Sequence, residues 1–323
     1  MTASPTPLTW AVLGTANIAR AQFLPALAEA GGRPAVVAGR SLARAQAWAA
    51  EHGVERGVEG YAAALADPSV DAVYLALPNA LHAGWTIKAV QAGKAVLCEK
   101  PLSTSVDDTS RVLAAVEETG GLLWEAFVFP FGPQFGRVAS LLADGVIGEV
   151  REIESAFHFR LSRDSDIRMS AALGGGCLAD VGCYPIRLAQ LVFGASPERA
   201  QVSAQHRGEV ETDAAAVLDY PGGRRLLLSC GFDRAYDTTT RIIGTDGWIS
   251  IDNPFHPGAA AAITVVRPGH EPVTERAMTD GHSFTAAVRH VTAAVRGSEA
   301  PRHLAVDDSL ATAHAIAMAQ AQA

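Results

Sequence analysis

The chain opens its first regular region with Leu8-Thr9-Trp10-Ala11-Val12-Leu13-Gly14-Thr15-Ala16-Asn17-Ile18-Ala19. Its first half, Leu8–Leu13, is almost wholly apolar and predicts a strand buried on both faces, and a helical pattern follows. Between them Gly14 permits a tight turn, Ala16 is small enough for a pyrophosphate to approach the backbone, and Ala19 allows close helix–strand packing. A strand, turn and helix built of small residues without any cofactor site would have a similar sequence. The place of Gly14–Ala19 in the first strand–helix turn of the domain favours a dinucleotide-binding loop.

The next hundred residues repeat this alternation of strand and helix. Further strand-like runs are Pro34–Ala38, Ala72–Leu77, Ala95–Cys98 and Leu122–Phe127, and helical spacing marks Ile18–Ala30, Ser41–His52, Leu81–Gln91 and Val106–Thr119. Strands that alternate with helices predict a parallel sheet covered by helices. We therefore expect an α/β fold that starts with a doubly wound Rossmann domain over residues 8–125, after a disordered arm over residues 1–7.

After residue 125 strands follow one another with turns between them. The expected strands are Val150–Leu161, Arg199–His206, Ala214–Tyr220, Arg225–Phe232, Thr238–Ile243 and Trp248–Ile251, and the expected helices are Cys177–Phe193, Ser283–Arg296 and Val306–Ala319. Pro221–Gly223 and Gly244–Gly247 are typical hairpin turns. This pattern predicts an α+β domain over residues 126–323 with an open, mainly antiparallel sheet.

Composition narrows the class of protein. The 323 residues carry 26 Lys and Arg against 34 Asp and Glu, a net charge of −8, and 49% are hydrophobic. The hydrophobic share excludes intrinsic disorder, and the negative charge argues against nucleic acid as the main partner. No apolar run reaches the roughly 18 residues of a membrane span, and the N-terminus lacks a signal-peptide pattern.

Four cysteines, Cys98, Cys177, Cys183 and Cys230, lack the density of a disulfide framework. We expect reduced structural thiols in a cytoplasmic protein. Cys177 and Cys183 lie close together in the sequence, but no second pair follows at zinc spacing, so no metal site is expected.

The end of the second strand bears on the choice of cofactor. An NAD-binding fold usually places an acidic residue there, whereas this chain has Arg40 and Ser41, with Arg44 one turn later. A guanidinium and a hydroxyl suit a ribose 2′-phosphate, so NADP(H) is expected to be preferred, with NAD(H) possible. The alternative is a solvated arginine beside a serine that caps the next helix.

A lysine stands at the end of a later strand, in Ala92-Gly93-Lys94-Ala95-Val96-Leu97-Cys98-Glu99-Lys100-Pro101. Ligands of such sheets bind at the carboxyl ends of the strands. Together with Gly14–Ala19, with Leu77-Pro78-Asn79 followed by His82, and with Gly174–Pro185, this stretch resembles the Gfo/Idh/MocA family of oxidoreductases. The similarity is greatest to its dimeric dihydrodiol dehydrogenase and bacterial xylose dehydrogenase branch.

The resemblance implies roles for individual residues. It makes Lys100 the catalytic residue, together with Asp180 and Tyr184. It also places Leu77, Pro78, Asn79, His82, Glu99 and Lys100 at the cofactor, in addition to the residues expected there from the first loop and the end of the second strand, which are Gly14, Thr15, Ala16, Asn17, Ile18, Arg40, Ser41 and Arg44. Independently, positions 180 and 184 are four apart, which puts both side chains on one face of an α-helix.

The chain departs from relatives after Phe127. Pro130 and Gly132 stand where many relatives carry an arginine and a histidine, so two polar groups near the substrate are missing. The residues that could supply polar contacts instead are His158, Arg160, Arg168 and His282. Because of this departure, the sequence does not identify the substrate.

We therefore expect an NADP(H)-dependent oxidoreductase that transfers hydride to or from a secondary alcohol or ketone of a neutral sugar, cyclitol or trans-diol. One alternative is a ketosugar or deoxysugar reductase of the anhydrofructose or 3-keto sugar type, and another is a non-catalytic NADP-binding regulator. A homodimer or homotetramer that associates through the C-terminal sheet is also expected.

Overall fold

The computed structural model describes residues 7–162, 165–258, 261–276 and 283–323. The chain divides into two compact units. Unit 1 comprises Met1–Ser103, Asp107–Ala126 and Phe284–Ser309, and unit 2 comprises Thr104–Val106, Phe127–Ser283 and Leu310–Ala323. Of the predicted N-terminal arm, only Pro7 belongs to the described residues.

Unit 1 is built on a six-stranded parallel sheet of order β3-β2-β1-β4-β5-β6. Its strands are β1 (Thr9–Leu13), β2 (Arg33–Gly39), β3 (Arg56–Glu59), β4 (Ala72–Leu75), β5 (Ala95–Cys98) and β6 (Leu123–Glu125). Its helices are η1 (Ala19–Phe23, a π-helical turn), α1 (Leu24–Glu29), α2 (Leu42–His52), α3 (Tyr61–Leu65), α4 (Asn79–Gln91) and α5 (Val106–Thr119). This order is that of the dinucleotide-binding doubly wound fold, so the predicted Rossmann architecture is confirmed.

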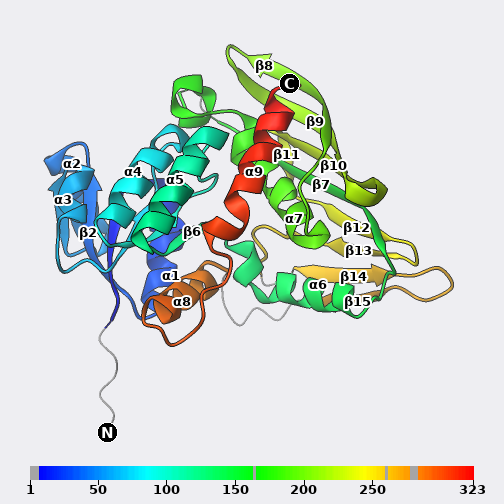
Figure 1. Cartoon of the computed structure of the whole chain (residues 1–323), viewed down its shortest axis with the longest axis horizontal. Helices are drawn as coiled ribbons and strands as arrows, with labels where there is room; N and C mark the ends of the chain where they lie inside the picture. The colour runs from blue at the N-terminus through cyan, green and yellow to red at the C-terminus, as the bar shows by residue number, and fades with distance from the viewer. Residues whose placement is uncertain (1–6, 163–164, 259–260, 277–282) are drawn as a thin grey trace, which may run out of the picture. The chain divides into compact units, whose positions relative to one another are not determined.

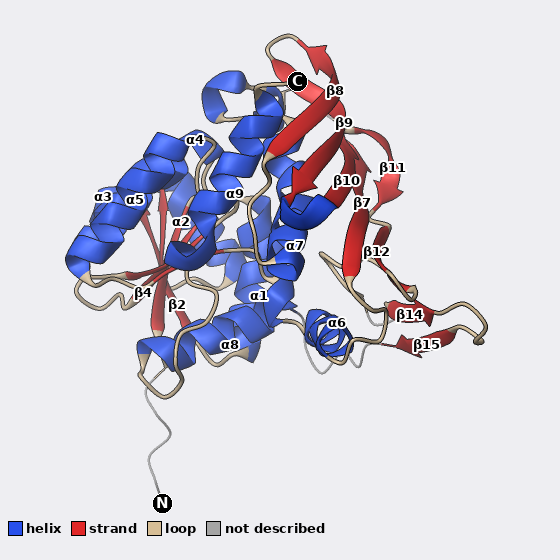
Figure 2. Cartoon of the chain, turned by 45° about the vertical axis from the view of Figure 1, so that its right-hand side comes forward, coloured by secondary structure: helices blue, strands red, loops and turns tan. Residues whose placement is uncertain are grey.

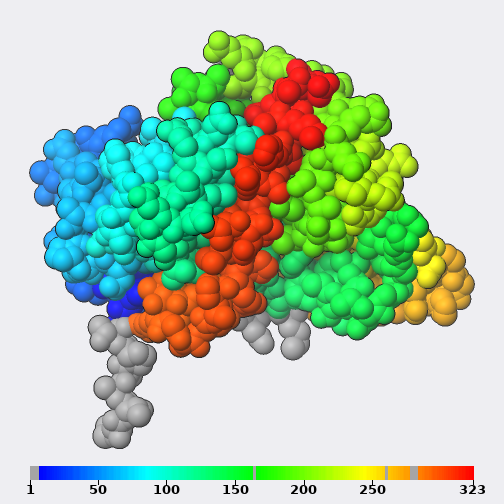
Figure 3. Space-filling model, viewed as in Figure 1, coloured from blue at the N-terminus to red at the C-terminus, as the bar shows by residue number. Residues whose placement is uncertain are grey.

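Burial explains why these segments pair as they do. Every residue of β1, β4 and β5 is buried, as expected for strands covered on both faces. α2 and α3 pack beside β2 and β3 (Figure 1). α5 buries Val112 and Val116 and turns its charged side to solvent, where it forms part of the surface that faces the viewer in Figure 3.

The chain returns to unit 1 near its C-terminus. There α8 (Ser283–Val295) and the first turn of α9 (Ala305–Gln320) join this unit, although the sequence assigned them to the second domain. Local contacts give the reason: the Phe284 ring lies 6.2 Å from that of Tyr74, and Trp124 Nε1 donates to the carbonyl of Arg302 at 3.0 Å. Tyr74 and Trp124 lie far from residues 284–302 in the sequence, so no local sequence pattern predicts these contacts.

Unit 2 holds a nine-stranded sheet of order β15-β14-β13-β12-β7-β10-β9-β8, with β11 also paired to β7. The strands are β7 (Val150–Arg160), β8 (Arg199–Arg207), β9 (Val210–Tyr220), β10 (Arg224–Gly231), β11 (Asp233–Asp237), β12 (Thr240–Gly244), β13 (Trp248–Ile251), β14 (Ala262–Val266) and β15 (Val273–Arg276). The helices are α6 (Pro133–Ala143), a π-helical turn η5 (Leu178–Gly182), α7 (Cys183–Phe193) and the rest of α9, with short 3-10 turns η2 (Phe129–Phe131), η3 (Ile167–Met169), η4 (Ala171–Leu173) and η6 (Pro221–Gly223).

This second sheet is antiparallel apart from one pair. β9 and β10 form the hairpin predicted at Pro221–Gly223, and β12 and β13 form the one predicted at Gly244–Gly247. β10, however, runs parallel to β7, because β8 and β9 intervene in the sequence before the chain returns beside β7. Figure 2 shows β7, β9 and β10 side by side, with α7 against the sheet.

Elements without an apolar run were not expected from the sequence. β11 is exposed along its whole length, and β3 and β15 bury no residue fully. Hydrogen bonds to neighbouring strands hold their backbones in place. Such pairing needs no apolar side chains, so the sequence shows no hydrophobic pattern at these strands. α6, which begins at Pro133, a favoured first residue of helices, and β14, which is an apolar run, carried a sequence signal but were also missed.

All four cysteines lie in the described part of the chain as buried thiols. Cys177 and Cys230 are neighbours, 3.8 Å apart at Sγ, and this contact together with burial raises the pKa of Cys230. Across the described ranges, no group of three or more His, Cys, Asp or Glu is placed to hold a metal ion. Nor is any helix in those ranges long and apolar enough to span a membrane.

Candidate active site

The predicted phosphate loop follows β1 directly. Gly14 adopts a φ of +101°, and a Cβ at this position would lie 2.5 Å from the carbonyl oxygen of Ala76. Its N–H donates to the carbonyl of Ala38 at 2.9 Å, which closes the turn. Helical conformation begins at Asn17, so the backbone from Thr15 onward leads into the start of a helix. The turn and the helix start fit a pyrophosphate, because only glycine tolerates this crowding and the first N–H groups of a helix attract anions.

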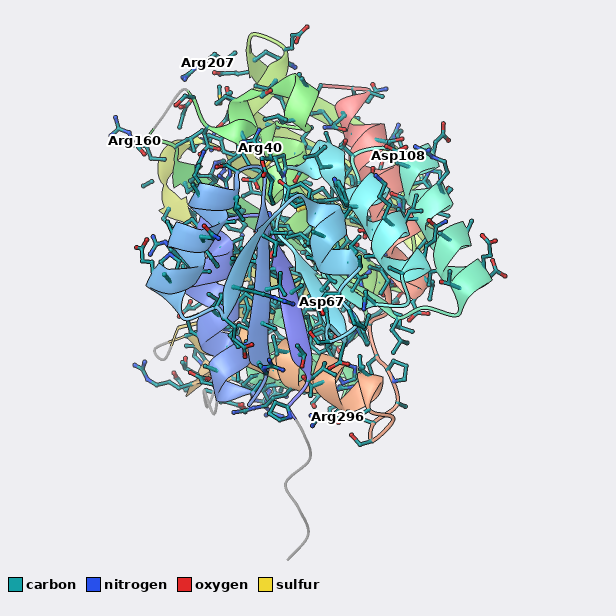
Figure 4. The ribbon with its side chains drawn as sticks, turned by 90° about the vertical axis from the view of Figure 1, so that its left-hand side faces the viewer. Arg40, Asp67, Asp108, Arg160, Arg207 and Arg296 are labelled. Carbon is teal, nitrogen blue, oxygen red and sulfur yellow. The ribbon has the colours of Figure 1, made fainter. Side chains whose placement is uncertain are left out.

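The end of β2 carries the residues expected to select the cofactor. Arg40 and Arg44 are exposed, and Figure 4 shows Arg40 at the end of β2. Ser41 holds the N-cap position of α2, but its side chain makes no capping hydrogen bond. The capping alternative therefore lacks its defining contact, and the two cations and the hydroxyl fit a phosphate group.

The turn that carries Lys100 follows β5 at the carboxyl edge of the sheet. The Glu99 N–H donates to the Leu75 carbonyl at 2.9 Å, and the Glu99 carboxylate accepts a short hydrogen bond from the Tyr74 hydroxyl. Lys100 is half-buried, and its peptide bond to Pro101 is cis. Tyr74 thus holds a residue expected to line the nicotinamide ribose, a contact that sequence reasoning missed.

His82 lies on α4 and is almost fully buried. Its Nδ1 lies 2.7 Å from the carbonyl oxygen of Pro101, and its Nε2 lies 2.7 Å from that of Leu77. Both ring nitrogens therefore face protein carbonyls, which corrects the expectation that this side chain contacts the cofactor. His82 instead connects the Leu77–Asn79 loop with the Lys100 turn.

The same burial makes stability depend on pH. Desolvation by burial lowers the pKa of His82 and outweighs the carbonyls of Pro101 and Leu77, which raise it; the charge of Lys100 adds a smaller lowering effect. The unfolded chain, with a histidine pKa of about 6.5, then binds protons more readily than the folded one, so stability is complete above this pH and declines as pH falls below it. Urea unfolding between about pH 8 and pH 5 should show a shallower decline in His82→Gln, by up to about 1.4 kcal/mol per pH unit. Parallel curves for both proteins would contradict this.

Asp180 lies in the π-helical turn η5, ahead of α7. Two of the glycines before it are needed for steric reasons: a Cβ on Gly175 would lie 2.3 Å from the Arg168 carbonyl oxygen, and one on Gly176 would lie 2.5 Å from Glu211 Oε1. Glu211 also accepts from the Leu178 N–H at 3.3 Å, near the start of this turn. The predicted helix Cys177–Phe193 is therefore a π-helical turn followed by an α-helix.

Arg168 binds Asp180 directly. Its Nε donates to Asp180 Oδ2 at 2.7 Å, and its terminal nitrogen donates to Asp166 Oδ1 at 3.1 Å. The Asp180 carboxylate raises the pKa of the guanidinium, with a further contribution from Asp166. Arg168 was expected to contact substrate; in the structure it binds two carboxylates, and a contact with substrate stays a prediction.

Tyr184 stands in the first turn of α7 and is largely buried. Its ring lies among aromatic neighbours, at centroid distances of 5.5 Å to Phe127, 5.1 Å to Phe157, 5.1 Å to Phe255 and 5.5 Å to His256. Phe129, next to Pro130, extends this cluster by packing on Phe255. The surroundings of Tyr184 are therefore mainly aromatic.

The remaining candidates for substrate contact lie elsewhere. Phe157 faces Tyr184, so His158, the next residue of the strand, points to the other face of the sheet, where its Nε2 contacts Ser229 Oγ at 2.5 Å. Arg160 is exposed at the end of the same strand (Figure 4). The expectation for His158 is therefore wrong, because strand alternation separates it from Tyr184. His282 lies outside the described residues.

Comparison with known proteins places this geometry in a family. Residues 8–127 match a family model described as the oxidoreductase family with an NAD-binding Rossmann fold, and residues 135–250 match that of the GFO/IDH/MocA C-terminal domain. The chain belongs to the Gfo/Idh/MocA family of oxidoreductases. The resemblance drawn from the sequence is thereby confirmed.

Individual relatives differ in what they act on. D-xylose 1-dehydrogenase (NADP(+)) 2 of Haloferax volcanii is 37% identical over 90% of this chain and 90% of its own length. Trans-1,2-dihydrobenzene-1,2-diol dehydrogenase of Xenopus laevis is 31% identical over 75% of this chain and 74% of its own. The crystal structure of KijD10, a 3-ketoreductase from Actinomadura kijaniata in complex with NADP and TDP-benzene, has a TM-score of 0.89, 36% identity and coverage of 98% and 97%.

Proposed function

We propose that this oxidoreductase uses NADP(H) to transfer hydride to or from a secondary alcohol or ketone of a neutral sugar, cyclitol or trans-diol. The observation that carries the proposal is the Lys100 turn, which is held by Tyr74 and His82 at the carboxyl edge of a dinucleotide-binding sheet. The names of the relatives give it a substrate class, because they include a sugar dehydrogenase and a trans-diol dehydrogenase.

The cofactor would be held by three segments of unit 1. The Gly14–Ile18 loop would take the pyrophosphate, Arg40, Ser41 and Arg44 the 2′-phosphate, and Leu77–Asn79 with Glu99 the nicotinamide ribose. When bound, the nicotinamide supplies or accepts the hydride. An NADP-dependent xylose dehydrogenase and an NADP-bound 3-ketoreductase among the relatives support the choice of NADP(H) over NAD(H).

The choice of cofactor can be tested at Arg40. Arg40→Ala removes one cation from the expected phosphate site, and loss of a charge-assisted contact costs on the order of 1.5–3 kcal/mol. We expect the Kd for NADPH to rise roughly tenfold or more, while that for NADH stays within about twofold. Fluorescence titration with both nucleotides measures this, and an unchanged Kd for NADPH would remove Arg40 from the site.

Lys100 is proposed to move the proton. In the oxidation it takes the proton of the substrate hydroxyl, and in the reduction it returns that proton to the oxygen. Tyr184 and Asp180 are proposed to orient the oxygen, since a phenol both donates and accepts hydrogen bonds and a carboxylate accepts them. A non-catalytic NADP-binding regulator would not need such a set, and turnover of any polyol or diol would exclude it.

A neutral substrate fits the charges around Asp180. Arg168 is bound to Asp180 and Asp166, so this cluster has one cation for two carboxylates. An anionic substrate would normally need a bidentate arginine that is not already bound to a carboxylate, or a helix N-terminus of its own. The aromatic neighbours of Tyr184 favour the apolar face of a sugar or diol ring.

The second candidate is a 3-ketosugar reductase that acts on a nucleotide-linked sugar. A dTDP-3,4-didehydro-2,6-dideoxy-alpha-D-glucose 3-reductase from Actinomadura kijaniata, 36% identical over 94% of this chain, favours it. The deciding experiment screens NADP+ reduction over aldoses, inositols and trans-diols, and NADPH oxidation over free and dTDP-linked ketosugars. The neutral-substrate proposal expects kcat/KM to be at least about tenfold higher for the uncharged compounds, and the opposite order would replace it by the second candidate.

We also propose that the protein forms a homodimer or homotetramer through the sheet of unit 2. Along β7, Ile153, Ser155 and Phe157 are buried toward α7, whereas Glu154 and Ala156 on the other face are only half-buried. A sheet face that one chain leaves only half-buried is available to pack against the same face of a second copy. Light scattering coupled to size exclusion would give the mass, and a monomer at micromolar concentration would contradict this.

A further inference from the structure

A buried carboxylate lies beside the turn that carries Lys100. Glu125 ends β6, and in the sheet register it is the partner of Cys98, two residues before Lys100. Only 7% of its surface is exposed. Burying a carboxylate is costly unless protein groups replace its water, so the contacts of this side chain show what it holds.

Both oxygens of the Glu125 carboxylate accept hydrogen bonds. Oε1 accepts from the backbone N–H of Leu102 at 2.7 Å, and Oε2 accepts from the Ser309 hydroxyl at 2.5 Å. An ionised carboxylate is an acceptor at both oxygens, and its hydrogen bonds are short and strong. Protein groups therefore hold the Glu125 side chain at both of its oxygens.

The contact between Glu125 and the Leu102 amide lies directly after Lys100 in the chain. Pro101 has no N–H, so the first amide donor after Lys100 is that of Leu102. On the other side of Lys100, the Glu99 N–H is bound by the Leu75 carbonyl. The backbone is thus anchored both before and after Lys100, and the anchor after it is a side chain from a neighbouring strand.

We propose that Glu125 is a positioning residue for Lys100, which fixes the path of the backbone on the C-terminal side of the turn through the Leu102 amide. This inference rests on the proposed role of Lys100 in proton transfer. Displacement of a proton-transfer group by about 1 Å can cost up to a hundredfold in rate, so loss of the anchor should act on turnover more than on cofactor binding.

The experiment compares three variants with the wild-type protein. Glu125→Ala removes both hydrogen bonds, whereas Glu125→Gln keeps an oxygen for Leu102 and an amide that can donate to the Ser309 hydroxyl. Asp71→Ala is the matched control, because Asp71 Oδ2 also accepts from a backbone amide, that of Thr9 at 2.8 Å, but at the amino end of the sheet. Each is assayed with the best substrate from the screen and by hydrogen–deuterium exchange of the Leu102 amide.

In Glu125→Ala we expect kcat to fall about 10- to 100-fold, with the KM for NADPH within about threefold and faster exchange at Leu102. Glu125→Gln should keep kcat within about fivefold, and Asp71→Ala should change neither kcat nor the exchange at Leu102. If Glu125→Ala does not fold, Ser309→Ala takes its place, with faster exchange at Leu102 and a smaller loss of kcat.

An unchanged kcat, or unchanged exchange at Leu102, in a folded Glu125→Ala or Ser309→Ala protein would overturn the inference. A loss in Glu125→Gln as large as in Glu125→Ala would also overturn it, since shape and hydrogen bonds are kept there. Failure of the proposed function looks different, because Lys100→Ala would then keep its turnover. If Lys100→Ala is inactive while Glu125→Ala is fully active, only the role of Glu125 is wrong.

Discussion

Lys100→Ala is expected to lower turnover by at least ~100-fold while the Kd for NADPH stays within about threefold. The reason is that the alanine removes the proposed proton-transfer group but leaves the turn itself intact. His82 contacts the carbonyl of Pro101, and Tyr74 donates to Glu99, and neither contact involves the lysine amine. Steady-state kinetics and nucleotide fluorescence titration measure the two quantities separately.

The control for this variant is another lysine of the same unit. Lys88 lies on α4 with its amine 4.3 Å from the centre of the Trp85 ring, and its replacement by alanine should leave both turnover and cofactor binding unchanged. If Lys100→Ala retains turnover within a few-fold, the proton passes through another group. A large rise in the Kd for NADPH would instead show that Lys100 serves mainly to bind the cofactor.

Much of unit 1 could be predicted because its strands are continuous apolar runs. The bounds of β5 and α5 match the sequence interpretation residue for residue, and the turn at Gly14 follows from steric need. β3 and β11 could not be predicted in the same way, because polar residues give no burial signal. Strand pairing, which is not local, decides whether such segments form strands.

The surroundings of the candidate site were harder to predict than its main residues. Arg168 and Asp180 are twelve residues apart, and no periodicity relates positions on a turn and on a π-helical segment. Glu125 could have been selected from the sequence, because it is a charged residue at the end of a parallel strand. Lys100 lies in a similar place, two residues after the end of β5. His158 could also have been assigned correctly, because adjacent strand residues face opposite sides.

Arg168→Met should lower both stability and turnover, because it leaves the carboxylate of Asp180 without its guanidinium partner. Hydrogen bonds to charged groups contribute about 1.5–3 kcal/mol, and the 37% exposure of the Arg168 side chain places the expected loss of unfolding free energy at the lower end of that range. We expect turnover to fall at least ~10-fold, because Asp180 would no longer be held in one orientation. Urea unfolding at neutral pH and steady-state kinetics measure the two effects.

A double-mutant cycle separates the ion pair from the packing of the arginine stem. Asp180→Asn keeps the shape of the side chain but removes its charge, so Arg168→Met should cost less in that background than in the wild-type protein. The expected coupling energy is about 1 kcal/mol or more, since two residues in direct contact do not act additively. Fully additive losses would mean that the 2.7 Å contact between Arg168 and Asp180 contributes nothing, and Arg168 would again become a candidate for binding an anionic substrate. In that case Arg168→Met should raise the KM for sugar phosphates more than the KM for their neutral parents.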